Sequence, residues 1–246
     1  MPNLSLSTGW VKVANGDLQI DAYLAQPETS GPWPAVIVFQ EIFGVNHHIR
    51  DVAERIAREG YVAIAPAIYQ RFAPGFETGY TPADIDLGRR YKDQTTAAEL
   101  VSDTQATIAY LQGLPQVKSA AIATIGFCFG GHVSYLVATL PEIKATAAFY
   151  GAGIATMTPG GGAATINCTP NIAGTLYAFF GEQDASIPLG QVDQIEAALT
   201  AAQIPHRVFR YPADHGFFCD QRGSYQAEAA QAAWAEVKRL FKATLE

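Results

Sequence analysis

The chain has 246 residues, 49% of them hydrophobic and 16% charged, which is the composition of an ordinary globular protein of one or two domains. The formal net charge is −7 and no run of lysine or arginine forms a basic stripe, so a nucleic-acid-binding surface is not expected. No segment has the pattern of a secretory signal or a membrane span, and the three cysteines form no close pair. We therefore expect a cytoplasmic protein with reduced thiols and no membrane contact.

The predicted strands begin with an N-terminal hairpin. Two alternating runs in the first 25 residues are separated by Asn15-Gly16, a dipeptide typical of tight hairpin turns. Continuous apolar runs follow, as in strands buried on both faces of a parallel sheet. These runs cover residues 34–40, 61–67, 120–127, 145–151, 175–181 and 206–212.

Segments with helical periodicity lie between these strands. One apolar stripe consists of Val101, Thr104, Ile108 and Leu111. A second helix covers the C-terminal segment, with Ser224 as its predicted N-cap. The alternation predicts an α/β fold with a mostly parallel central sheet, helices on both faces and the antiparallel hairpin at the start. No linker divides the chain, so we predict a single domain over residues 1–246.

Two segments interrupt the alternation of strands and helices. Residues 69–91 and 151–171 are rich in glycine, proline or polar residues, and each follows a predicted strand. We interpret both as surface excursions at the C-terminal edge of the sheet, where open α/β sheets bind their ligands.

The stretch "TIGFCFGG", residues 124–131, is the first candidate for chemistry. It predicts a strand that runs into a sharp turn before a helix, with Cys128 between small residues. Such a turn would expose the thiol and direct the backbone N–H of Phe129 toward a developing oxyanion. The alternative is a buried structural cysteine beside a glycine-rich turn.

Possible partners of Cys128 follow two later strands. Asp184 lies just after one predicted strand and His215 after the last one, in the chain order nucleophile, acid and histidine. Asp214 competes with Asp184 as the acid. Adjacent side chains in an extended segment point apart, so Asp184 is favoured over the direct neighbour of His215.

Glu41 is the fourth candidate, at the C-terminal end of the strand over residues 34–40. If its carboxylate approaches Cys128, its charge opposes thiolate formation and leaves the resting thiol neutral until substrate displaces the glutamate. The backbone N–H of Ile42 would then be the second oxyanion donor. The alternative for Glu41 is an exposed loop carboxylate.

With these residues in place, the sequence resembles the dienelactone hydrolase family of α/β-hydrolases. The resemblance covers nearly the whole chain and is carried by "QEIFGVN", "GFCFGG", "GEQDASIP" and "HGF". It implies the α/β-hydrolase fold, a triad of Cys128, His215 and Asp184, and a Glu41 that holds the resting thiol. It also implies an oxyanion hole made by the amides of Ile42 and Phe129, and no metal or organic cofactor.

The family resemblance implies opening of dienelactone, a small lactone, to maleylacetate. Family members that act on dienelactone hold its carboxylate with two arginines, one of them four residues after the catalytic histidine, but Cys219 stands at that position here. Arg222 is the candidate replacement. The candidates for the second arginine are Arg71, Arg89 and Arg90.

Other functions are left open by the sequence. One alternative is a carboxylesterase of the same family that acts on other small esters. A thiol redox protein is disfavoured because no resolving cysteine lies near Cys128, and a non-catalytic binding module because the set of candidate residues is intact. The expected partner is a small lactone or ester, anionic if the arginine clamp exists. The expected state is a monomer or a small homo-oligomer.

Overall fold

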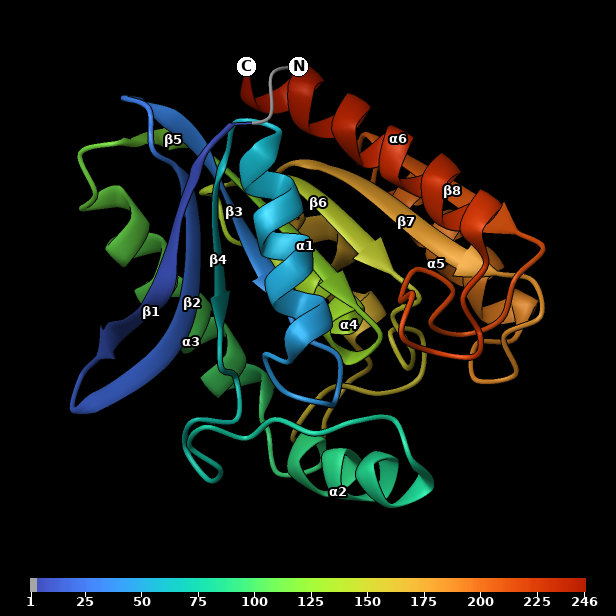
Figure 1. Ribbon diagram of the computed structural model, residues 1–246. Coiled ribbons are helices and arrows are strands. Elements are labelled where there is room, and N and C mark those ends of the chain that lie inside the picture. The colour runs from blue at the N-terminus through green and yellow to red at the C-terminus, as the bar shows by residue number, and fades with distance from the viewer. Residues whose placement is uncertain (1–3) are drawn as a thin grey trace.

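The computed structural model describes residues 4–246 as one eight-stranded sheet with helices on both faces (Figure 1). The strand order is β1-β2-β4-β3-β5-β6-β7-β8. The strands are β1 (Leu6–Asn15), β2 (Leu18–Pro27), β3 (Trp33–Phe39), β4 (Val62–Pro66), β5 (Val117–Phe127), β6 (Ile143–Phe149), β7 (Thr175–Gly181) and β8 (His206–Tyr211). All the predicted strands are present, within a few residues of their predicted bounds.

The antiparallel part of the sheet is the predicted hairpin. Strands β1 and β2 pair with Asn15 opposite Leu18, so the turn between them contains Asn15-Gly16, and Gly16 has a positive φ of 58°. Strand β2 joins the hairpin to β4 in antiparallel fashion, and every pair from β4 to β8 is parallel. The predicted α/β class is therefore confirmed.

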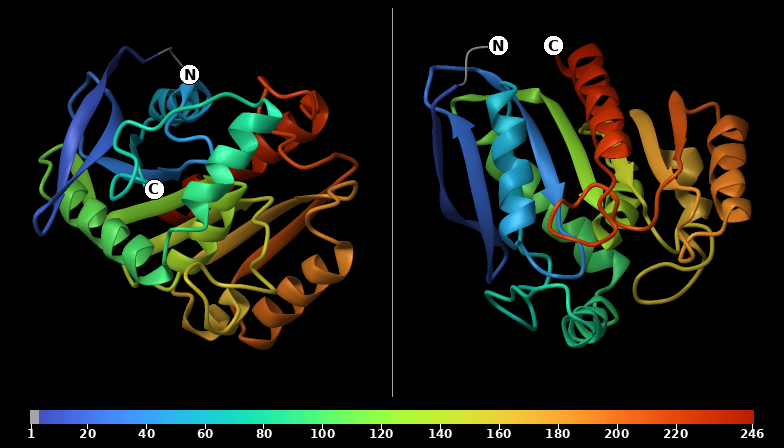
Figure 2. Two further views of the ribbon diagram at one scale, coloured as in Figure 1. Left: turned by 90° about the horizontal axis from the view of Figure 1, so that it is seen from below. Right: turned by 45° about the vertical axis from the view of Figure 1, so that its right-hand side comes forward.

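Helices cover both faces of the sheet. Helices α1 (His47–Arg58) and α6 (Ala227–Leu245) lie on one face, and α3 (Ala97–Gln112), α4 (Phe129–Val137) and α5 (Leu189–Ala201) lie on the other (Figure 2, left). The central parallel strands are largely apolar and buried, which fits this arrangement, since each of their faces needs a covering layer. None of the helices in residues 4–246 is long and apolar enough to cross a membrane.

The predicted N-cap of the last helix is wrong. Helix α6 begins after Gln226, whose side chain accepts a hydrogen bond from the Ala229 N–H at 2.7 Å. The preceding residues form a tight turn, in which the Tyr225 N–H donates to the Arg222 carbonyl. This turn draws Ser224 inward, where it lines a cavity instead of capping the helix.

The two excursions lie at the C-terminal edge of the parallel strands (Figure 1). The segment 69–91 is more regular than predicted, because it contains most of helix α2 (Pro82–Lys92). Thr81 and Asp84 form a capping box at the start of α2, in which each side chain bonds the backbone of the other residue. The segment 151–171 ends in the short 3-10 helix η1 (Thr165–Asn171).

Candidate active site

A cavity of about 480 Å³ opens at the C-terminal edge of the sheet, between the two excursions. Cys128 and His215 lie in its wall. Helix α2 contributes Ile85, Arg89 and Lys92, and the segment 151–171 contributes Ala152, Gly153 and Met157. The remaining lining residues include Ile42, Phe43, Phe129, His132, Ser186, Asp214, Arg222 and Ser224.

Cys128 occupies the strained turn between β5 and α4. Its φ of 55° and ψ of −116° are rarely adopted by non-glycine residues, and such strain is retained mainly at functional sites. The turn depends on glycines that stand against backbone. A Cβ at Gly130 would lie 2.3 Å from the Phe39 carbonyl oxygen, and one at Gly131 would lie 2.2 Å from that of Phe149.

Gly131→Ala is therefore expected to destabilise the protein by at least about 2 kcal/mol, because rigid backbone must move to make room. Urea unfolding measures the change in the free energy of unfolding. Gly190→Ala is the matched control, since nothing lies within 4 Å of a Cβ at that helical position. It should change stability by less than about 1 kcal/mol. Equal losses in both variants would refute this account of the turn.

Asp184 and His215 form a direct pair next to Cys128. His215 Nδ1 lies 2.7 Å from Asp184 Oδ2, and the Asp184 side chain is fully buried. The second carboxylate oxygen accepts from the Ser186 N–H at 2.8 Å. Asp214 accepts from the backbone N–H of His215, its one side-chain bond within residues 4–246, so Asp184 is the acid that contacts the imidazole ring.

The surroundings of His215 favour its charged form. Burial lowers its pKa, but the neighbouring Cys128 sulfur and the hydrogen bond with Asp184 outweigh burial and raise the pKa of His215 to about 10. An imidazolium at neutral pH stabilises negative charge on a sulfur beside it. The arrangement can therefore hold a thiolate–imidazolium pair.

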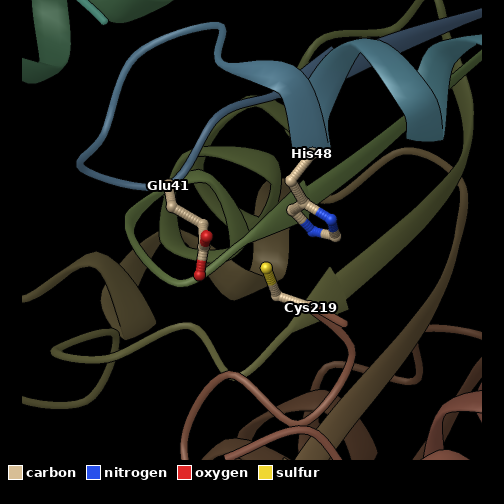
Figure 3. Close-up of side chains that lie close together, drawn as sticks. All are labelled: Glu41, His48 and Cys219. Atoms are coloured by element: carbon tan, nitrogen blue, oxygen red, sulfur yellow. The ribbon is translucent and has the colours of Figure 1, made fainter. Parts of the chain in front are cut away.

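Glu41 is buried, with 1% of its surface exposed, and does not lie in an exposed loop. Its Oε1 accepts from Arg222 Nη1 at 2.8 Å, and no hydrogen bond joins it to the Cys128 thiol. In this structure Glu41 is thus paired with Arg222, and its hold on the resting thiol stays a prediction. Burial raises the pKa of Glu41, although the Arg222 charge opposes that rise. The carboxylate also faces His48 and Cys219 (Figure 3).

Arg222 packs against a pair of aromatic rings, Phe43 and Tyr80, that were not among the predicted site residues. Its guanidinium carbon lies 5.7 Å from the centre of the Phe43 ring and 5.9 Å from that of Tyr80. The Tyr80 hydroxyl in turn receives hydrogen bonds from Asn46 Nδ2 at 3.0 Å and Cys219 Sγ at 3.4 Å. In the sequence, Tyr80 is marked by nothing more than its position before Thr81, the residue that begins the capping box of α2.

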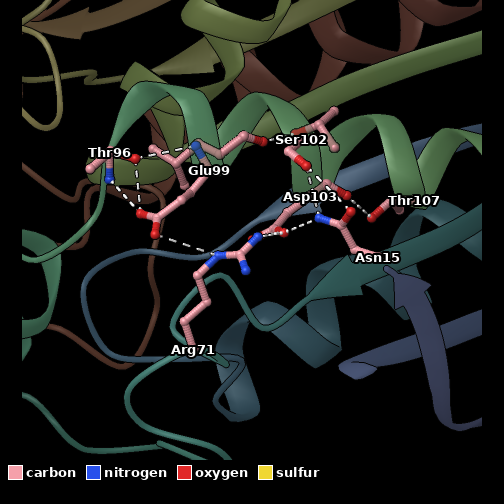
Figure 4. Close-up of polar contacts among 9 residues, drawn as sticks. Asn15, Arg71, Thr96, Glu99, Ser102, Asp103 and Thr107 are labelled. Atoms are coloured by element: carbon pink, nitrogen blue, oxygen red, sulfur yellow. Dashed lines mark hydrogen bonds and ion pairs between the residues drawn. The ribbon is translucent and has the colours of Figure 1, made fainter. Parts of the chain in front are cut away.

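The three other candidate arginines differ in position. Arg71 pairs with Asp103 and Glu99 of helix α3 and does not line the cavity (Figure 4). Arg89 lines the cavity and lies one helical turn after Ile85, which also lines it. Arg90, the next residue along α2, is not part of the lining. A second positive group beside Arg89 is Lys92, which the sequence reasoning did not consider.

Two backbone amides at the cavity wall fit the predicted oxyanion donors. Ile42 and Phe129 both line the cavity. Phe129 is the first residue of α4, so its N–H has no partner within the helix. Within residues 4–246, neither amide donates to a backbone carbonyl. Both are therefore available to a ligand oxygen.

Comparisons with known proteins agree with this architecture. The model of the "Dienelactone hydrolase family" matches residues 20–245. A Synechocystis relative named "Putative carboxymethylenebutenolidase" is 60% identical over 98% of this chain and 99% of its own length. An Escherichia coli K12 protein of the same name is 34% identical over 98% of this chain and 89% of its own length. The crystal structure of a Klebsiella pneumoniae "Putative Dienelactone Hydrolase" has a TM-score of 0.88 at 31% identity, covering 97% of this chain and 99% of that one.

The fold is thus the α/β-hydrolase fold, and the protein is a hydrolase. The family model extends from within β2 to the final helix and includes the strained turn, and the Synechocystis relative is aligned over 98% of the chain. This chain belongs to the dienelactone hydrolase family.

Proposed function

We propose that this hydrolase opens the lactone ring of dienelactone, giving maleylacetate, with Cys128 as nucleophile. The observation that carries the proposal is the paired His215 and Asp184 beside a cysteine on a strained turn, in a cavity that also holds Arg222. A thiol with an imidazole base and an orienting carboxylate is an arrangement suited to acyl transfer.

The proposed reaction begins when the Cys128 sulfur attacks the lactone carbonyl carbon. The carbonyl oxygen becomes an oxyanion that the amides of Ile42 and Phe129 stabilise. Collapse breaks the ring C–O bond and leaves a thioester and an enolate. The enolate then takes a proton, either from the His215 imidazolium or from the attacking water. In the first case the neutral imidazole accepts the proton of the water that attacks the thioester, and in both cases the C–S bond breaks and the Cys128 thiolate is released.

The proposed substrate is a small anionic molecule, although the protein carries a formal net charge of −7. Arg222, Arg89 and Lys92 all line the cavity, so the local field there differs from the overall charge. Arg222 is bound to Glu41 in this structure. A substrate carboxylate would compete with Glu41 for the guanidinium, which links substrate binding to the state of this buried acid.

Arg222→Ala is expected to raise KM for cis-dienelactone about 10- to 100-fold, which corresponds to the loss of a charge-assisted hydrogen bond. Hydrolysis of a neutral aryl ester should fall by a clearly smaller factor, since that substrate has no carboxylate to bind and is affected only through the loss of the Glu41–Arg222 pair. Ultraviolet loss of the lactone and visible release of the aryl alcohol measure the two rates.

Two further variants separate the possible causes. Arg222→Lys keeps the positive charge but cannot form the bidentate hydrogen bonds of a guanidinium. Arg90→Ala removes an arginine of α2 that lies outside the cavity lining. Arg90→Ala should behave like the unmodified protein. Equal losses on lactone and neutral ester in Arg222→Ala would contradict the carboxylate clamp. Failure of the unmodified protein to open the lactone while it cleaves aryl esters would favour the small-ester carboxylesterase.

A further inference from the structure

Three side chains with metal-binding atoms converge behind the cavity wall, outside the proposed triad. Glu41 follows β3, His48 lies in the first turn of α1, and Cys219 belongs to the loop after β8. Figure 3 shows the carboxylate, the imidazole and the thiol directed toward one another. One ligand atom from each residue lies within 4.8 Å of the other two, and no residue of the three is more than 1% exposed.

Two polar atoms of this cluster lack a partner. Glu41 Oε2 and His48 Nε2 are buried and form no hydrogen bond with any of residues 4–246. At least nine in ten buried polar groups in proteins have a partner, and an unsatisfied one costs about 1–3 kcal/mol. His48 is further enclosed by the rings of Phe127 and Phe218, 5.7 and 6.3 Å away. The two unpaired atoms therefore indicate a binding position between these side chains.

We propose that Glu41, His48 and Cys219 bind a divalent transition-metal ion, for which Zn²⁺ is the best match. Zinc takes thiolate, imidazole and carboxylate ligands together, and three protein ligands leave the fourth tetrahedral position to water. Harder ions such as Mg²⁺ prefer all-oxygen sites. The proposal does not rest on the proposed lactone hydrolysis, which needs no metal, although both involve Glu41 and its partner Arg222.

The charges of the cluster suit such an ion. A carboxylate and a thiolate together balance a charge of +2, and Cys219 releases its proton to solvent when Sγ binds the metal. His48 Nε2 forms no hydrogen bond within residues 4–246, so that nitrogen is free to bind the metal. Arg222 already borders the open cavity and can turn toward it when the metal takes its place on Glu41.

Metal binding requires the three ligand atoms to move closer together. Ligand atoms around tetrahedral zinc lie roughly 3.3–3.8 Å apart, given bonds of about 2.0–2.3 Å. The present separations, up to 4.8 Å, must therefore shrink by at most about 1.5 Å. Rotation of the three side chains covers such a distance, and the bond from Cys219 Sγ to the Tyr80 hydroxyl is the contact within residues 4–246 that the thiol would give up.

Zinc titration of the full chain tests the proposal. The dialysed protein should bind a single Zn²⁺ per chain, measured by calorimetry and by metal analysis after gel filtration. Cys219→Ser and His48→Gln should weaken that binding more than about 100-fold. Cys128→Ser and Cys168→Ser should retain it. No zinc binding, or binding that disappears only with Cys128→Ser, overturns the proposal.

A Co²⁺ titration of the unmodified protein tests the same site without the Cys219 and His48 variants, and so does not depend on how well those variants fold. Co²⁺ added to the unmodified protein should give the near-ultraviolet charge-transfer absorption of a thiolate–cobalt bond and the visible bands of a tetrahedral ion. The Cys128→Ser variant should give the same spectrum. A spectrum of an octahedral ion without sulfur, or one that requires Cys128, contradicts the assignment to Cys219.

Discussion

Replacing Cys128 with alanine is expected to lower kcat for ester hydrolysis by a factor on the order of 10⁴–10⁶ while the protein stays folded. The side chain ends in a cavity and its backbone forms the turn, so the thiol contributes chemistry more than packing. An activated aryl ester is the suitable substrate, because its hydrolysis does not depend on the carboxylate clamp. Far-ultraviolet circular dichroism and urea unfolding check the fold.

Cys168→Ala is the matched control for this loss. Cys168 lies in η1 and is half-buried like Cys128, but it does not line the cavity. Its variant should retain activity within about twofold. Retained activity in Cys128→Ala would contradict the nucleophile, whereas loss in both variants would indicate damage to the fold. Rapid oxidation of Cys128 to a disulfide by peroxide would instead favour the redox alternative.

The sequence was sufficient to predict the sheet and the turn because both depend on local patterns. Apolar runs recur in the parallel strands, and Gly130 and Gly131 mark positions where a Cβ would meet backbone. The order of Cys128, Asp184 and His215 was readable because each residue follows a strand, and the C-terminal ends of parallel strands meet at one edge.

The features that the sequence did not reveal have specific physical causes. Helix α2 has one buried residue, Gly88, so it lacks the apolar stripe from which helices are predicted. The partner of Glu41 depends on Arg222, 181 residues away, and no periodicity relates two side chains at that separation. Tyr80 and Phe43 were missed for the same reason, since they matter only once Arg222 packs against their rings.

The second large effect concerns the charge on the resting sulfur. Iodoacetamide is expected to alkylate Cys128 rapidly near neutral pH, because His215 stays protonated and Glu41 is engaged by Arg222. The pKa of His215 is raised above its ordinary value, so its positive charge is present below that value and is lost as pH rises through about 10. Fast alkylation should therefore persist from neutral pH into the alkaline range. Slow alkylation at neutral pH would restore the hypothesis of a neutral thiol held by Glu41.

Asp184→Asn tests whether the Asp184 carboxylate keeps His215 positively charged. An amide oxygen can still orient the ring, but it cannot balance an imidazolium, so the pKa of His215 should fall. We expect ester hydrolysis to drop about 10³- to 10⁴-fold and alkylation at neutral pH to slow, with the two proteins converging at high pH as hydroxide forms the thiolate directly. Asp214→Asn is the control, because its amide oxygen can still accept from the His215 N–H. If both variants alkylate alike, the Asp184 carboxylate is not what keeps His215 charged, and the thiolate must depend on the turn and the start of α4 instead.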